Sequence, residues 1–294
     1  MDIQIKNLTK KYSTNNVNVL DNINLTIKPG ILGLVGENGA GKTTLIKILA
    51  TMVKQTSGEI YIGQYKLPKD ESNVRRNLGY LPQNFEMFNT LTVYEAMDYI
   101  SALKNISIRT RKKEINKLLD EVNLLNKNNY QIRQLSGGMK QRLGIAASLL
   151  GDPKVIIMDE PTVGLDPTER LKFRSLISRY AEEKTIIVSS HIISDIAMLC
   201  NDIAIMKKGR ILYAGSTTKL VKSMDDKVYF VSVNESDEIN KDIYQNIISI
   251  SRKEKRLEVR FFLDTLPTLE GAISSEPSLE DAYFYITSRS GDIK

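Results

Sequence analysis

The spacing of hydrophobic and polar residues predicts short strands that alternate with helices. Strand-like runs, either alternating or continuously apolar, occupy Asp2–Ile5, Leu20–Ile27, Ile31–Val35, Val155–Met158, Thr185–Ser189 and Ile203–Met206. Uninterrupted apolar strands such as Val155–Met158 are typical of parallel strands that are buried on both faces. The pattern therefore predicts an α/β core that binds its ligands at the carboxyl ends of the strands.

Two further regions have patterns of their own. Residues from about 86 to 150 are mainly helical, and one helix there begins in a basic run and carries apolar residues at helical spacing, namely Ile115, Leu118, Leu119 and Val122. Near the C-terminus, Lys227–Val233 and Arg256–Leu263 are strand-like. We expect a first domain over residues 1–218, which contains the helical subdomain, and a small α+β accessory domain over residues 219–294.

Composition and charge narrow the class of protein. The chain is 41% hydrophobic and 26% charged, which is typical of a globular protein. It contains no apolar stretch approaching the ~18 residues that cross a bilayer, and its start lacks the apolar core of a signal peptide. We therefore expect a cytoplasmic protein. The single cysteine, Cys200, lies in an apolar stretch and is expected to be buried. The net charge of +6 comes from 41 basic and 35 acidic residues, which are intermixed along the chain.

A glycine-rich segment directly follows the strand Ile31–Val35. Residues 36–43 read Gly-Glu-Asn-Gly-Ala-Gly-Lys-Thr, which matches the phosphate-loop pattern G-x-x-x-x-G-K-[ST] in its strand, loop, helix context. The glycines let successive N–H groups face a polyphosphate, and the helix that starts near Lys42 directs its positive end to the same place. We expect phosphate contacts from Gly36, Glu37, Asn38, Gly39, Ala40, Gly41, Lys42, Thr43 and Thr44, with the Thr43 hydroxyl on Mg²⁺.

Two adjacent carboxylates follow the apolar strand Val155–Met158. Asp159 comes first and is expected to hold a water molecule bound to Mg²⁺. Glu160, one residue further on, is expected to polarise the attacking water as a general base. The sequence thus predicts that both carboxylates face the phosphate loop.

The order of these motifs resembles that of the ABC ATPases. Leu135-Ser136-Gly137-Gly138-Met139-Lys140-Gln141-Arg142 resembles the ABC signature, and it lies between the phosphate loop and Asp159, as in that family. The resemblance covers about residues 1–216. It implies an ABC-type P-loop NTPase fold with a helical signature subdomain, and a protein that binds and hydrolyses ATP with Mg²⁺.

The same resemblance implies roles for four further residues. Tyr12 resembles the aromatic residue that stacks on adenine, and Gln83 resembles the glutamine that joins Mg²⁺ sensing to the membrane partner. Asp166, in Gly164-Leu165-Asp166, resembles the loop that crosses to the other subunit. His191, the single histidine, resembles the histidine that contacts the γ-phosphate. Because Glu160 and His191 are both present, a subunit competent for hydrolysis is expected.

The signature segment has its own physical chemistry. Ser136, Gly137 and Gly138 precede a helix that is predicted to run to about Leu150, so its free N–H groups and dipole can hold an anion. The resemblance implies that this anion is ATP of a second subunit, in a symmetric dimer with two sites. Met139 stands where many family members have glutamine, which puts one ribose contact in doubt but leaves the serine and glycines intact.

The C-terminal segment indicates the work that the ATPase does. Glu276-Pro277-Ser278-Leu279-Glu280-Asp281-Ala282-Tyr283-Phe284 resembles the end of ATPases that serve ABC-2 type drug or peptide exporters. This implies export through a separate membrane permease that docks near Gln83 and residues 85–88, with the chain held on the inner face of the membrane. The alternatives are a soluble ABC ATPase acting on nucleic acid or ribosomes, and a nucleotide sensor without turnover. The chain has no second phosphate loop and no long heptad run, so no nucleic-acid partner is expected.

Overall fold

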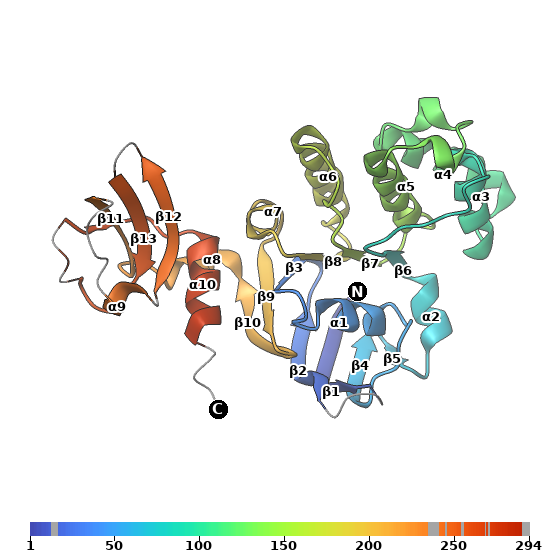
Figure 1. The fold of residues 1–294 in the computed structure, drawn as a ribbon. Helices are drawn as coiled ribbons and strands as arrows, with labels where there is room; N and C mark the ends of the chain where they lie inside the picture. The colour runs from blue at the N-terminus through green and yellow to red at the C-terminus, as the bar shows by residue number, and fades with distance from the viewer. Residues whose placement is uncertain are drawn as a thin grey trace.

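The computed structural model describes residues 1–12, 17–234, 241–244, 246–253, 256–267, 269 and 271–289. Within them, three sheets and their helices form the fold (Figure 1). The antiparallel sheet of the N-terminal region lies on one side of a central sheet, and helices α5, α6 and α7 lie on the other side (Figure 1). The third sheet and helix α10 form the C-terminal end of the molecule (Figure 1).

The central sheet has the strand order β10-β9-β3-β8-β7-β6. All neighbouring strands are parallel except β9 and β10, which pair antiparallel. The strands are β3 (Gly30–Val35), β6 (Leu78–Leu81), β7 (Val155–Asp159), β8 (Thr185–Ser190), β9 (Asp202–Lys207) and β10 (Arg210–Ser216). Every residue of β7 and β8 is buried, as the apolar runs Val155–Met158 and Ile186–Val188 predict. The parallel arrangement brings the ends of β3, β6, β7 and β8 to one edge of the sheet.

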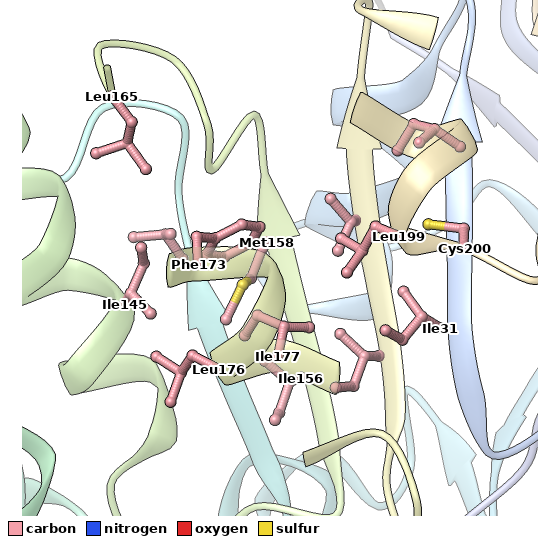
Figure 2. Packing of buried hydrophobic residues seen from close by; sticks show 14 of the residues in the cluster. Ile31, Ile145, Ile156, Met158, Leu165, Phe173, Leu176, Ile177, Leu199 and Cys200 are labelled. Atoms are coloured by element: carbon pink, nitrogen blue, oxygen red, sulfur yellow. The ribbon is translucent and has the colours of Figure 1, made fainter. Parts of the chain in front are cut away.

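Alternate side chains of the central strands enter two different cores. Ile156 and Met158 of β7 join the cluster that contains α6, which also includes Phe173, Leu176 and Ile177 (Figure 2). Val155 and Ile157 of the same strand join the opposite cluster. Cys200 is 4% exposed and packs in the first cluster, so the prediction that it is buried is confirmed. The two-sided burial explains why the sequence of each strand shows no alternation.

The N-terminal sheet is antiparallel, with the order β2-β1-β4-β5. Its strands are β1 (Ile3–Lys11), β2 (Asn18–Ile27), β4 (Ser57–Ile62) and β5 (Tyr65–Leu67). Helix α1 (Lys42–Leu49) packs between this sheet and the central sheet, with Leu45, Ile46, Ile48 and Leu49 in the shared core. The predicted strand Asp2–Ile5 is thus the start of a longer strand, and β4 and β5 were not predicted.

Residues 86–150 are mainly helical, as predicted. Helix α2 (Glu71–Arg76) precedes this region, which contains α3 (Val93–Leu103), α4 (Ile108–Glu121), the 3₁₀ turns η1 (Leu125–Lys127) and η2 (Ile132–Gln134), and α5 (Gly137–Leu149). Helix α3 begins at a capping box, in which the Thr92 hydroxyl accepts from the Glu95 N–H and the Glu95 carboxylate accepts from the Thr92 N–H. Helix α4 buries Ile115, Leu118 and Leu119 and exposes its basic start.

Helices α6 (Pro167–Tyr180) and α7 (Ile193–Leu199) complete the layer that covers the central sheet. Two contacts tie the helical region to this layer. The Arg142 guanidinium lies 3.2 Å from the Glu169 carboxylate of α6, and the Tyr180 hydroxyl donates to Glu121 at 2.9 Å. Helix α6 therefore contacts both the central sheet and the helical region.

The C-terminal region forms a sheet with the order β12-β13-β11-β14. Its elements are α8 (Thr217–Lys222), β11 (Val228–Asn234), α9 (Lys241–Tyr244), β12 (Ile247–Lys253), β13 (Arg256–Phe262), β14 (Ile273–Ser274) and α10 (Leu279–Arg289). The two predicted strands correspond to β11 and β13. Val228, Phe262 and Tyr283 join the same core as β3 and α6, so hydrophobic packing continues across the predicted boundary at residue 219. The division into two domains remains a prediction. No helix in the described part of the chain is long and apolar enough to span a membrane.

Candidate nucleotide site

The phosphate loop connects β3 to α1 at the carboxyl end of the central sheet. Gly41, the residue before α1, has φ of 105°, which glycine adopts without steric cost. A Cβ atom on Gly36 would lie only 2.4 Å from the Met206 carbonyl oxygen of β9. The loop is also fixed by the turn after β9, where the Gly209 N–H donates to the Ala40 carbonyl at 3.0 Å. The glycines thus permit both the turn of the loop and its close approach to the neighbouring strand.

Lys42 places a buried positive charge inside this loop. Its side chain is largely enclosed, with the residue 6% exposed. The ammonium donates to the Gly36 carbonyl at 2.6 Å and to the Glu37 carbonyl at 3.1 Å. Burial lowers the pKa of Lys42, while the nearby carboxylates of Glu160 and Asp159 oppose that shift. The loop therefore combines backbone N–H groups with a cation, which is the chemistry that binds polyphosphate.

A cavity of about 170 Å³ opens beside the loop. It contains residues from four separate parts of the sequence: β2, the phosphate loop with the start of α1, the segment after β6 and the residue after β7. Its lining residues are Val19, Asn38, Gly39, Ala40, Gly41, Lys42, Thr43, Thr44, Gln83 and Glu160. Most of the residues expected to contact phosphate thus lie around one space, together with Gln83 and Glu160. Their individual roles in binding remain predictions.

Asp159 and Glu160 are held by one serine of the adjacent strand. The Ser189 hydroxyl of β8 donates to the Asp159 carboxylate at 2.5 Å and accepts from the Glu160 N–H at 3.0 Å. Asp159 is 1% exposed and Glu160 is 5% exposed. Glu160 has φ of 54°, which is uncommon for a residue with a side chain. The two carboxylates are thus buried at the site, in a backbone conformation that Ser189 stabilises.

Glu160 also contacts the single histidine of the chain. The Glu160 carboxylate lies 2.8 Å from Nδ1 of His191, which follows β8. The His191 side chain is 52% exposed, whereas that of Glu160 is 6% exposed. The carboxylate therefore contacts one of the two nitrogens of a half-exposed ring. A carboxylate and an imidazole at this distance can orient a water molecule and a phosphate group.

The expected metal ligands all present oxygen atoms. They are the Thr43 hydroxyl, the Gln83 side-chain carbonyl and the Asp159 carboxylate, which are the hard donors that Mg²⁺ prefers. The described residues contain no group of three or more His, Cys, Asp or Glu side chains that could hold a metal ion. Mg²⁺ commonly uses one or two protein oxygens together with substrate phosphates and water, so these residues fit this ion.

The signature segment and the Asp166 loop lie next to each other. Ser136 caps α5, where its hydroxyl accepts from the Met139 N–H at 3.3 Å, and Asp166 caps α6, where its carboxylate accepts from the Glu169 N–H at 2.8 Å. A Cβ atom on Gly138 would lie 3.3 Å from the Gly164 carbonyl oxygen. Ser136, Gly137 and Asp166 are exposed, and neither these three residues nor Gly138 line the cavity of this chain's own phosphate loop.

Tyr12 lies directly after β1 and does not line the phosphate cavity. Its side chain is 38% exposed, and the Lys10 ammonium lies 4.8 Å from the ring centroid. An accessible aromatic face is consistent with stacking on a base, and its role in binding adenine remains a prediction.

The site contains residues that the sequence did not indicate. Ser189 bonds to the Asp159 carboxylate and to the Glu160 backbone N–H, and Val19 lines the cavity from β2. Thr162, two residues after Glu160, donates its hydroxyl to the buried Asp195 carboxylate of α7 at 2.8 Å. A polar residue at the end of an apolar strand was the available signal for Ser189, whereas the contact between Thr162 and Asp195 joins segments that have no common motif.

The strand, the glycine loop, the buried lysine and the two carboxylates on a neighbouring strand define a P-loop nucleoside triphosphatase. Residues 20–163 of this chain match the sequence model of the ABC transporter family. The ABC transporter ATP-binding protein sll0415 of Synechocystis sp. is 34% identical over an alignment of 283 residues, which covers 91% of this chain and 78% of that relative. This chain therefore belongs to the ATP-binding proteins of ABC transporters.

The names of two other relatives describe different kinds of transport. YbhF of Escherichia coli, named as a probable multidrug ABC transporter ATP-binding protein, is 33% identical over 78% of this chain and 40% of its own length. The methionine import ATP-binding protein MetN of Francisella tularensis is 38% identical over 73% of this chain and 64% of its own length. This chain therefore spans less than two thirds of either relative.

Among solved structures, the dimeric ATP-binding cassette MJ0796 in a post-hydrolysis state with ADP and phosphate is similar to this chain. The TM-score is 0.68 with 29% identity, and the match covers 73% of this chain and 98% of the cassette. The predicted ABC ATPase fold is confirmed. The chain is an ATPase that binds ATP with Mg²⁺ and serves as the ATP-binding subunit of a transporter.

Proposed function

We propose that two copies of this chain bind ATP between them and energise export through a separate membrane permease. The observation that carries this proposal is the exposure of the signature segment away from the chain's own phosphate cavity. Ser136 and Gly137 present the start of α5 to solvent beside the exposed Asp166 loop. A second copy placed with its phosphate loop on this surface would complete two equivalent sites around one two-fold axis.

Within each site, we assign complementary tasks to the residues described above. Lys42 and the N–H groups of residues 38–44 hold the phosphates, and Glu160 polarises the attacking water. His191 orients the water and the γ-phosphate from the accessible side of Glu160. The contact between Glu160 and His191, at 2.8 Å, supports this assignment because it places an imidazole beside the carboxylate that lines the phosphate cavity.

A groove beside the nucleotide site suits the membrane partner. It has a volume of about 440 Å³ and lies between the segment after β6 and helix α5, lined by Gln83, Asn84, Phe85, Glu86, Met87, Asn89, Ile132, Gly137, Lys140, Gln141 and Leu143. Phe88, at 62% exposure, packs edge-to-face on Tyr99, with the ring centroids 6.0 Å apart. An exposed aromatic pair beside a groove is typical of a protein interaction site. Because Gln83 lines both spaces, a permease here would contact the nucleotide site.

The direction of transport rests on the C-terminal segment, residues 276–284, which resembles that of exporter ATPases. We infer that the chain works on the cytoplasmic face of the membrane, where ATP is available. The named relatives include both a multidrug protein and an importer, so direction needs its own measurement.

The decisive experiment is purification of the full chain from detergent-solubilised membranes of its native cell. We expect a polytopic membrane protein to co-purify, and we expect Phe88→Glu to reduce its recovery, with Phe284→Glu, another exposed phenylalanine, as the matched control. Recovery of ribosomes or nucleic acid without a membrane protein would instead support the soluble alternative.

Direction can be tested in inside-out vesicles that carry the complex. Added ATP should increase a cell-derived compound inside such vesicles, as measured by mass spectrometry of their contents. Loss of a compound from the vesicles on ATP addition would show import.

A further inference from the structure

A buried carboxylate joins the segments that follow the two proposed catalytic residues. Asp195 lies on α7, four residues after His191, and its side chain is 6% exposed. It accepts from the Thr162 hydroxyl at 2.8 Å and pairs with the Arg174 guanidinium at 2.9 Å. The Arg170 guanidinium lies 3.5 Å from the same carboxylate. One side chain therefore contacts three residues from two other segments.

Each partner of Asp195 lies on a segment that also carries a proposed site residue. Thr162 is 3% exposed and lies two residues after Glu160. Arg170 and Arg174 lie on α6, the helix that starts at the Asp166 cap, and Arg170 also donates to the Leu165 carbonyl at 3.2 Å. The cluster thus joins the Glu160 segment, the helix of the Asp166 loop and the His191 segment.

The position of the His191 ring is set by the segment that carries it, in which the Ser190 hydroxyl accepts from the Ile192 N–H at 2.9 Å. The His191 side chain is 52% exposed, so its position depends on the backbone of the segment between β8 and α7. Helix α7 has seven residues and begins without a side-chain cap. A displacement of about 1 Å can separate a catalytic pair from its productive geometry. The contact of 2.8 Å between His191 and Glu160 therefore requires that α7 stay fixed relative to the end of β7.

We propose that Asp195 is a positioning residue for ATP hydrolysis, which holds the His191 segment against the Glu160 segment through Thr162 and against α6 through Arg174 and Arg170. This inference rests on the proposed roles of Glu160 and His191. A carboxylate that pairs with two guanidinium groups and a hydroxyl inside the protein is satisfied on several sides, so it fixes the relative places of the three segments.

The test measures kcat and nucleotide affinity separately on the purified full chain. Asp195→Ala should lower kcat at least tenfold while the Kd for ATP, measured by titration calorimetry, stays within twofold of the wild-type value. The matched control is Asp281→Asn, because Asp281 is also a buried aspartate, 1% exposed, paired with Arg260 at 2.7 Å in the C-terminal region. That control should lower the unfolding temperature and keep kcat. A smaller loss of kcat for Asp195→Ala, or an equal loss of ATP affinity, would overturn the proposal.

The conservative variant Thr162→Val tests the direct link and guards against misfolding of Asp195→Ala. It removes one hydroxyl and leaves both ion pairs, so we expect a three- to tenfold loss of kcat. The kcat of the double variant should be no more than twofold lower than that of Asp195→Ala, since both changes break the same hydrogen bond. If the fold losses in kcat of the two single variants multiply in the double variant, the two residues act independently and the proposed link is contradicted. If Asp195→Ala does not fold, an unchanged kcat in Thr162→Val overturns the proposal.

Glu160→Gln is assayed in parallel so that two failures can be told apart. If Glu160→Gln retains turnover, the proposed catalytic assignment is wrong. If Glu160→Gln is inactive and Asp195→Ala turns over at the wild-type rate, the assignment stands and the role of Asp195 is wrong.

Discussion

The Glu160 carboxylate and Nδ1 of His191 lie 2.8 Å apart, although they are 31 positions apart in the chain. The parallel pairing of β7 with β8 brings them together, since Glu160 follows one strand and His191 follows the other. Ser189 fixes the Glu160 end of the contact through the backbone N–H. The site is therefore assembled by the register of two neighbouring strands.

Glu160→Gln should reduce ATP turnover by at least about 100-fold, because removal of a positioned general base costs this much in typical enzymes. ATP binding should persist, so the variant should accumulate as an ATP-bound dimer that size-exclusion chromatography detects. Glu183→Gln changes an exposed glutamate away from the cavity and serves as the control. Rapid turnover in Glu160→Gln would remove Glu160 from its assigned role.

Lys42→Met should weaken ATP binding by at least about tenfold, since one buried charge-assisted contact to phosphate contributes on the order of 1.5–3 kcal/mol. Titration calorimetry gives the Kd directly. Lys47→Met, on the same helix but outside the cavity, should bind ATP like the wild type. Equal affinities for the two variants would contradict the phosphate role of Lys42.

Gly36→Ala should destabilise the fold, because its Cβ would lie 2.4 Å from the Met206 carbonyl oxygen of β9. Overpacking of this kind typically lowers the free energy of unfolding by about 1–3 kcal/mol. Gly137→Ala is the comparison, since nothing lies within 4 Å of its Cβ position. Urea denaturation of both variants measures the difference. Equal free energies of unfolding would show that β9 can shift away from the added methyl group without loss of stability.

The burial of Lys104 should make the free energy of unfolding increase with pH. Its ammonium donates to the Leu150 carbonyl at 2.7 Å, and burial lowers its pKa from 10.5 to about 8. Between these two pKa values the unfolded chain binds more protons than the folded chain, so this group makes the folded state more stable as pH rises from about 8 to about 10.5. Below pH 8 the lysine is charged in both states, so this group causes no further change of stability with pH.

Comparison with Lys104→Met isolates this component, because the other titrating groups are common to both proteins. From pH 7 to about pH 10 the wild type should gain on the order of 2 kcal/mol in free energy of unfolding relative to the variant. Denaturant titrations at several pH values measure that difference. A constant difference would mean that the pKa of Lys104 is the same in both states.

The local sequence was sufficient to predict those parts of the fold that are specified by a few consecutive residues. Residues 36–43, the apolar run before Asp159 and the capping serine of α5 predicted the loop, the carboxylates and a helix start, since their geometry depends on local backbone preference and burial. The strands β4 and β5 escaped prediction because half-exposed antiparallel strands carry a weak pattern that is decided by their pairing partners. Strand β12, which is mostly exposed, escaped for the same reason.

Sequence alone determined the class of chemistry, because the glycine loop with Lys42 and the paired carboxylates define a phosphate site wherever they occur together. Only the tertiary structure decided how the parts meet. Strand register brought Ser189 to Asp159 and His191 to Glu160, and the packing of α6 on α7 brought Arg174 to Asp195. Such contacts depend on the pairing and packing of segments 21 to 31 residues apart, which no local preference encodes.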